Sequence, residues 1–168
     1  MSGKTIVLAH GVLGFGAPMG LPLLLHYFNG VAMYLRRNGH AVIAPQVNPI
    51  VRQRGGMLGD AILNQTSAGD RVHFIARSMG GLDARHAILS PKVAERIATL
   101  VTIGTPHLGS PVADAIAKPT DPLFNQIPPL LLRQLQENAG ALDDLTTAGA
   151  KKLDEMTPDN PNGNAGEE

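Results

Sequence analysis

Ser78 is the residue of this sequence whose neighbours most clearly suggest nucleophilic chemistry. The segment Ala76–Gly80 reads Ala-Arg-Ser-Met-Gly, follows an apolar run directly and precedes a helical pattern that begins at Leu82. This order predicts a strand, a sharp turn and a helix, an arrangement that strains the serine backbone and lifts its hydroxyl above a sheet. The small side chain of Ala76 and the absent one of Gly80 would let strand and helix pass closely. We therefore predict that Ser78 attacks a carbonyl carbon.

Two backbone amides are candidates for binding the negative charge that such an attack creates. The helix after Ser78 would point its positive end at the reacting atom, so the N–H of Met79 is the first candidate. The first apolar run of the chain ends in His10, Gly11 and Val12, a His-Gly turn of the kind that supplies a second donor. The N–H of Val12 is therefore the other candidate. We expect His10 and Gly11 to support the turn, with His10 hydrogen-bonded to backbone.

A structural role is the alternative for Ser78, because serine is common as the N-cap of a helix. The two roles predict different geometry. A capping serine has a relaxed backbone and an Oγ bonded to its own helix, whereas a nucleophile at a corner has a strained backbone.

Four short apolar runs predict the strands that would position this serine. Apolar residues at helical spacing lie between them, before Gly39 and around 57–62 and 82–88. This alternation predicts a three-layer α/β/α fold with a mainly parallel sheet, whose ligand site lies outside the carboxyl ends of the strands. The expected strands are Thr5–Ala9, Ala41–Ala44, Val72–Ala76 and Leu100–Ile103.

Length and composition indicate one domain. With 168 residues the chain can form a single core. We expect an α/β domain over 1–157 that includes a Pro-rich segment at 118–138, with helices at Leu130–Asn138 and Leu142–Met156. The polar residues 158–168 are expected to form a disordered tail.

Charge and residue usage exclude several function classes. Fourteen Lys and Arg balance fourteen Asp and Glu, so the net charge offers no basic field for nucleic acid or anionic lipid. The absence of cysteine excludes disulfides and thiolate metal sites, and we expect no cofactor or metal. No apolar run reaches the roughly 18 residues that span a bilayer, and no secretory signal precedes Thr5, so we expect no transmembrane segment and a cytoplasmic location.

Four motifs give the chain a resemblance to the bacterial triacylglycerol lipases and esterases among the α/β hydrolases. Beyond the Ser78 corner, the resemblance extends to about Pro158, and the helical pattern at Leu142–Met156 is similar to the helix after the lid of these enzymes. Related lipases are often secreted. The motifs are His10–Phe15 (HGVLGF), Tyr27–Val31 (YFNGV), Gly80–Arg85 (GGLDAR) and Thr102–Pro111 (TIGTPHLGSP).

The resemblance implies an activity and a set of roles. It implies a serine hydrolase that cleaves carboxylic esters of apolar acyl groups, from a small molecule or a lipid, through an acyl-enzyme on Ser78. It also implies an oxyanion hole formed by the N–H groups of Val12 and Met79. Segment 118–138 falls where these lipases place a lid, although ordinary core packing is an equal alternative for it.

Two residues depart from the pattern of these lipases. Arg77 stands where they usually have His, and Ala76 replaces a glycine. A permanent charge at Arg77 must pair with a carboxylate, for which Asp83 and Asp114 are candidates, or reach solvent.

The catalytic Asp and His of these lipases follow two further strands that have no counterpart here, so the chain resembles a C-terminally truncated member. His107, just after the fourth strand, is the best-placed substitute base, whereas His86 should point away from Ser78. The alternatives to an active esterase are a catalytically impaired remnant or acyl-binding module, and an acyltransferase using the same serine. An exposed sheet edge predicts a homodimer.

Overall fold

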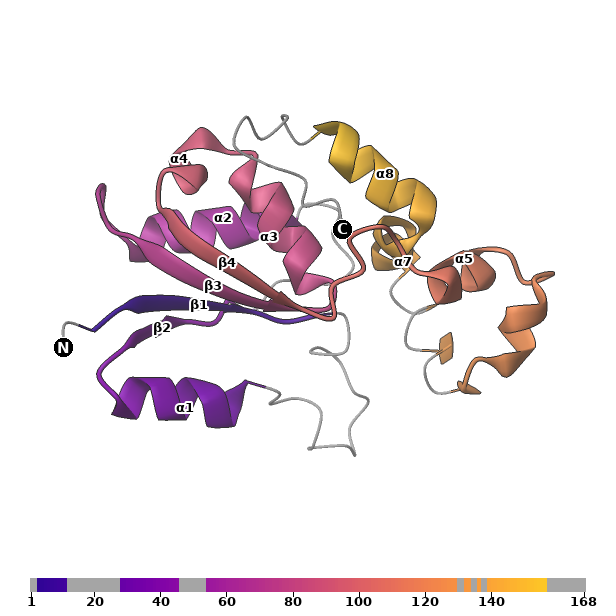
Figure 1. The fold of residues 1–168 in the computed structure, drawn as a ribbon, viewed down its shortest axis with the longest axis horizontal. Helices are drawn as coiled ribbons and strands as arrows, with labels where there is room; N and C mark the ends of the chain where they lie inside the picture. Colours follow the sequence, from indigo (N-terminus) through magenta and orange to yellow (C-terminus); the bar gives the residue numbers. More distant parts are fainter. Residues whose placement is uncertain are drawn as a thin grey trace, which may run out of the picture.

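A parallel four-stranded sheet forms the centre of the molecule. The computed structural model describes residues 3–11, 28–45, 54–129, 132–133, 136 and 139–156. The sheet order is β2-β1-β3-β4, and every neighbouring pair is parallel (Figure 1). The strands are β1 Thr5–Ala9, β2 Ala41–Ile43, β3 Val72–Arg77 and β4 Ile97–Ile103. All four predicted strands are present, and β4 begins three residues earlier than its apolar run suggested.

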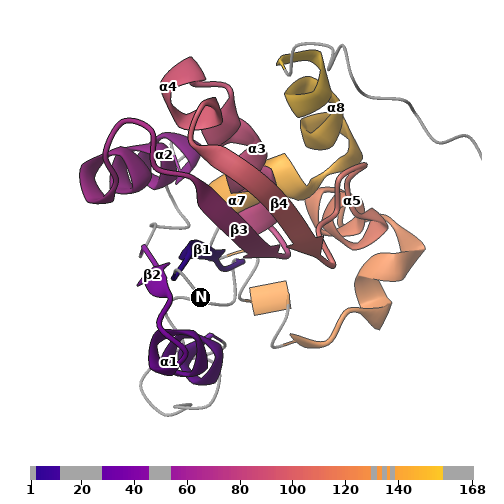
Figure 2. The ribbon, with the colours of Figure 1, turned by 60° about the vertical axis from the view of Figure 1, so that its left-hand side comes forward.

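Helices cover the two faces of the sheet unequally. Helix α1, Asn29–Arg37, lies on one face, and α2, Arg54–Gln65, lies on the other with α3, Gly80–Ile88, and the short α4, Pro91–Ala94 (Figure 1). Figure 2 shows α1 apart from the helices of the opposite face. The predicted three-layer α/β/α fold is confirmed.

The larger core lies between the sheet and helices α2 to α4. Alternate β3 side chains point into it, so that Phe74 and Ala76 are fully buried. They meet Leu58 and Ile62 of α2 within one apolar cluster. On the opposite face, the described residues form a smaller core of Ile6, Leu8 and Ala32 with partly buried neighbours.

A helical group follows β4 and packs on the start of α3. It contains α5, Pro111–Ala117, the 3-10 helix η2, Pro122–Gln126, α7, Ala139–Leu145, and α8, Thr147–Met156. Its apolar side chains enclose Met79 and Leu82. Met79, the residue directly after Ser78, is therefore buried against this helical group.

The single helix expected at Leu142–Met156 is in fact two helices that meet at Thr146. The Thr146 hydroxyl donates to Asp143 O at 2.7 Å and accepts from Gly149 N at 3.0 Å. Asp114 accepts a further bond from Thr147 N at 2.9 Å. These side-chain contacts satisfy backbone groups at a new helix start and so end the first helix.

The remaining expectations for this half of the chain fall partly outside the described residues. In segment 118–138, the structure describes η2 and places Ile127 in the cluster around Met79. Most of the helix expected at Leu130–Asn138, and the tail 158–168, lie outside the described residues. Within the described ranges, no helix is both long and apolar enough to cross a membrane.

Strand β4 occupies one edge of the sheet. Its Val101 and Ile103 side chains are 53% and 45% exposed. They alternate with half-buried residues that face α3. In the described ranges β4 is thus a terminal strand with apolar side chains exposed on the sheet face that carries α1, and pairing through its edge stays a prediction.

Candidate active site

Ser78 occupies the corner between β3 and α3 in a left-handed backbone conformation. Its φ is 53°, the one positive φ among non-glycine residues in the described ranges. Its N–H donates to Ile103 O at 2.9 Å, and its carbonyl accepts from Thr105 Oγ1 at 2.8 Å and Gly81 N at 3.1 Å. A non-glycine residue in the left-handed region raises the free energy of the folded state by about 1–3 kcal/mol. The contacts with the neighbouring strands must therefore hold Ser78 in this conformation.

The side chain of Ser78 does not cap the helix. Helix α3 has Met79 as its N-cap and shows no side-chain capping bond. Across the described ranges, the Ser78 Oγ makes no hydrogen bond with a protein group. The residue is half-buried, so part of its surface faces solvent.

Three glycines let the chain close around this corner. A Cβ on Gly11 would lie 2.6 Å from Ser78 Cβ and 2.9 Å from Ser78 Oγ. A Cβ on Gly80 would lie 2.5 Å from the carbonyl oxygen of Ala9. A Cβ on Gly81 would overlap Thr105. The loop after β1 therefore touches the serine side chain, while the start of α3 rests on β1.

Met79, the residue directly after Ser78, is the first predicted oxyanion donor. Its side chain is 1% exposed, and within the described part of the chain its N–H has no acceptor. An unbound amide at a helix start can receive a negatively charged oxygen. Val12, the other predicted donor, lies outside the described residues, but the preceding Gly11 contacts Ser78.

A buried ion pair lies under the corner. Arg54 Nε donates to Asp83 Oδ1 at 2.8 Å, and the two side chains are 5% and 4% exposed. Arg54 Nη2 also lies 3.3 Å from Asp144 Oδ2 and contacts Met79 Sδ. Burial raises the pKa of Asp83, and the Arg54 guanidinium opposes this shift. Arg54 thus connects α2, α3 and α7 behind the predicted oxyanion donor.

This ion pair changes the expectation for Arg77. Asp83, one of its two candidate partners, is bound to Arg54 instead. Asp114, the other, accepts from Thr147 N and Oγ1. Arg54 could not be identified from the sequence, since a single arginine at the start of a predicted helix gives no signal that it is buried.

His107 lies on the α3 side of the sheet. Its Nε2 is 3.1 Å from Thr102 Oγ1. Burial and the nearby Arg85 guanidinium lower its pKa, while Asp154 raises it. Arg85 comes seven residues after Ser78, about two helical turns into α3, and pairs with Asp154 of α8. Among the described residues, His107 makes no hydrogen bond to Ser78.

The other histidines near the corner have supporting positions. His10 Nδ1 donates to Gly11 O at 3.0 Å, and burial lowers the pKa of His10 while this bond raises it. A Cβ on Gly55 would overlap the His86 Cβ, so His86 faces α2. Throughout the described ranges, no group of His, Asp and Glu side chains could hold a metal ion.

The arrangement can place a hydroxyl and an amide on one carbonyl group. Thr105 and Gly81 complete the corner. Neither was predicted as a site residue from the sequence, although both lie inside the motifs that carry the family resemblance. The sequence clue to Thr105 is its position directly after Gly104. In the structure Gly104 has a φ of 57° and turns the chain after β4 toward Ser78.

Comparisons with known proteins identify the family and the fold of the chain. The family model described as the PGAP1-like alpha/beta domain matches residues 44–155. Triacylglycerol lipase 2 of Saccharomyces cerevisiae is 32% identical over 148 residues, which are 83% of this chain and 44% of that protein. The chain thus spans less than half the length of this relative.

Solved structures of a Bacillus licheniformis lipase, BlEst2, have the same fold. The mature form superposes with a TM-score of 0.65 at 21% identity, over 95% of this chain and 61% of the lipase chain. The propeptide form superposes with a TM-score of 0.64 at 21% identity, over 95% of this chain and 33% of the other.

Proposed function

Because the chain belongs to the family of PGAP1-like alpha/beta domains, we propose that it is a carboxylic ester hydrolase in which Ser78 is the nucleophile. The observation that carries the proposal is the strained corner, with a φ of 53° at Ser78 and an Oγ free of protein hydrogen bonds in the described ranges. A backbone held in a costly conformation at one polar residue is typical of a functional site.

The reaction proceeds in two steps. The Ser78 Oγ adds to the ester carbonyl carbon, and the carbonyl oxygen takes the negative charge. The bond between this carbon and the alcohol oxygen then breaks, and the alcohol leaves with the proton that the serine hydroxyl has lost. Water then attacks the acyl-enzyme, which releases the carboxylic acid and restores the serine. The N–H groups of Met79 and Val12 bind the oxyanion in both steps.

The substrate class follows from the relatives. The yeast relative is named a triacylglycerol lipase, so we assign an ester with an apolar acyl chain. The apolar cluster around Met79 includes Leu142 of α7 and Ile127 of the segment 118–138. We propose that the acyl chain binds on this side of the Ser78 corner.

An acyl-binding module with weak turnover is the second candidate. It is favoured by the contacts of the histidines, since across the described ranges neither His10 nor His107 hydrogen-bonds the Ser78 Oγ. A serine with an oxyanion hole but without its base still accelerates hydrolysis on the order of 10³-fold over water.

Covalent labelling tests the nucleophile. A fluorophosphonate probe should label the wild-type protein and the Ser67→Ala variant, which removes an exposed serine in a turn. It should not label Ser78→Ala. Folded wild-type protein that takes up no probe would overturn the assignment of Ser78 as nucleophile.

Turnover separates the two candidates. An active esterase should release nitrophenol from nitrophenyl butyrate much faster than the Ser78→Ala variant does, whereas the acyl-binding module should release it at a rate close to that of Ser78→Ala. Ser78→Ala measures the background in both cases.

A further inference from the structure

The solvent side of helix α1 carries apolar side chains. Val31, Met33 and Tyr34 are 41%, 49% and 67% exposed. Arg36 and Arg37 follow on the last turn and are exposed as well. We call these five residues the α1 outer face.

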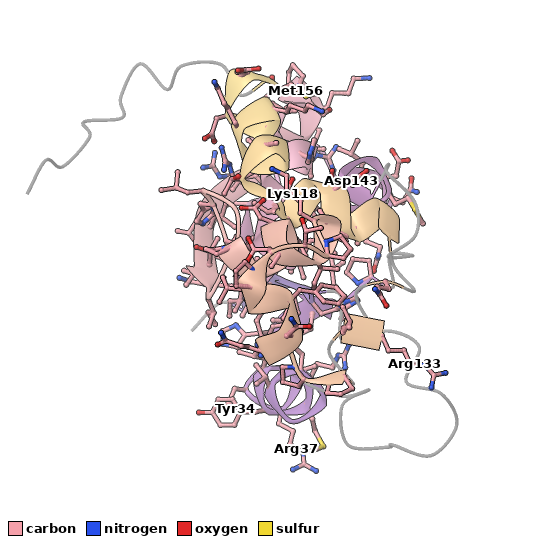
Figure 3. The ribbon with its side chains drawn as sticks, turned by 90° about the vertical axis from the view of Figure 1, so that its right-hand side faces the viewer. Tyr34, Arg37, Lys118, Arg133, Asp143 and Met156 are labelled. Atoms are coloured by element: carbon pink, nitrogen blue, oxygen red, sulfur yellow. The ribbon has the colours of Figure 1, made fainter. Side chains whose placement is uncertain are left out.

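Packing among the described residues does not explain this face. The inner side of α1 already buries Ala32, with Leu35 partly buried, against Ile6 and Leu8 of β1. A helix that meets only water on its outer side normally has polar residues there. Figure 3 shows Tyr34 and Arg37 projecting from α1 at one end of the molecule.

The charges of the protein are divided along the chain. Residues 1–59 contain five Lys and Arg and no Asp or Glu, and the first acidic residue is Asp60. The other nine basic and all fourteen acidic residues follow in 60–168. The balanced total therefore hides a basic first third. The backbone N–H of Lys4 donates to His40 Nδ1 at 3.1 Å, which places Lys4 just beyond the end of α1. Lys4 is exposed and adds a further positive charge there.

A shallow depression runs along this helix. Gly30, Met33, Arg36 and Arg37 line it, and its volume is about 540 Å³. Arg36 Nη2 donates to Val42 O at 3.3 Å, and Arg37 has no partner among the described residues. The depression therefore offers guanidinium groups beside a thioether, which suits a phosphate attached to an apolar chain.

From this combination we propose that the α1 outer face binds the protein to a lipid surface that contains anionic headgroups. Tyrosine places its ring at the headgroup level, aliphatic side chains enter the acyl boundary, and arginines are attracted to the negative surface. The proposal goes beyond ester hydrolysis and needs no contribution from Ser78.

Vesicle flotation tests the electrostatic part. The wild-type protein should float with vesicles of equal parts phosphatidylcholine and phosphatidylglycerol, and much less with phosphatidylcholine alone. Each basic residue near an anionic surface changes the partition coefficient about fivefold, so R36Q/R37Q should lower it about twenty-five-fold. K151Q/K152Q removes the same charge from exposed positions on α8 and should bind like wild type.

Tyr34→Ala tests the apolar part. It should weaken binding to the mixed vesicles in low and high salt, whereas R36Q/R37Q should have an effect mainly in low salt. Ser78→Ala should float like wild type, so a failed hydrolase assignment leaves this result intact.

Two outcomes would overturn the proposal. One is equal flotation of R36Q/R37Q, K151Q/K152Q and wild type. The other is a protein that ignores vesicles but sediments as a dimer that Tyr34→Ala dissociates, because the occupant of the face would then be a second copy of the chain.

Discussion

The two faces of the sheet differ in how completely they are closed. The face under α2, α3 and α4 buries Phe74, Leu58 and Ile62 almost entirely and includes the Arg54–Asp83 ion pair. The α1 face buries a small cluster and leaves apolar side chains exposed on α1 and β4. Among the described residues, the closed face therefore holds the Ser78 corner in place, and the α1 face is the one that leaves apolar side chains exposed to other molecules. Substitutions on the two faces should therefore have different effects.

The largest effect is expected for Arg54→Leu. This change leaves the Asp83 carboxylate buried without its charged partner, which should lower the free energy of unfolding by about 3–5 kcal/mol. Urea denaturation followed by circular dichroism measures it. The double variant R54M/D83L, which removes both charges, should recover most of the loss. A double variant as unstable as Arg54→Leu would show that the guanidinium contributes mainly through Asp144 and Met79.

A glycine at the corner should have the next largest effect. Gly80→Ala places a Cβ against the backbone of Ala9, which should lower the free energy of unfolding by about 1–3 kcal/mol and slow labelling of Ser78. Gly56→Ala is the matched control, because a Cβ there meets nothing within 4 Å and alanine favours the helix by about 1 kcal/mol. Equal stability of the two variants would contradict the close approach of α3 to β1.

A smaller effect is expected from pH. Burial lowers the pKa of His10 and His107 below the ordinary value of 6.5. Below pH 6.5 the unfolded chain therefore binds more protons at these sites than the folded protein, and stability falls as the pH drops toward the folded pKa values. Above pH 6.5 these two groups contribute no slope. Urea midpoints of wild type and His107→Gln measured from pH 8 to pH 5 check this, and parallel curves would exclude His107 as a source of the slope.

The smallest effect on stability is expected at the edge strand. Val101→Lys and Ile103→Lys replace exposed side chains and should change the free energy of unfolding by less than about 0.5 kcal/mol. The same changes should abolish the homodimer predicted from the open edge, since lysine on an edge strand opposes pairing. Sedimentation velocity measures this, with Leu123→Lys as a control at an exposed position on η2. A stable monomer in the wild type would contradict the predicted homodimer.

Local patterns accounted for much of the fold. Buried parallel strands read as short apolar runs, and for this reason β1 to β4 could be located from Val7, Phe74 and their neighbours. The corner was visible because small residues must flank a serine placed there. The break between α7 and α8 was not visible, since it depends on Thr146 and on the distant Asp114.

The residues that complete the site are distant in sequence. Thr105 reaches the Ser78 carbonyl over 27 residues, and Arg54 reaches Asp83 over 29. No local pattern predicts which arginine becomes buried or which carboxylate it meets. For this reason, Asp83 was a candidate partner of Arg77 on the sequence alone, whereas in the structure it pairs with Arg54.

By itself, the order of the residues determined the layered α/β fold, the position of the corner at Ser78 and the uneven distribution of charge. Only the tertiary structure decided that Arg54 is buried behind Met79 and that Tyr34 and Arg37 project outward from α1. Local propensity and periodicity act over a few residues, whereas burial and charge pairing depend on which distant elements pack together.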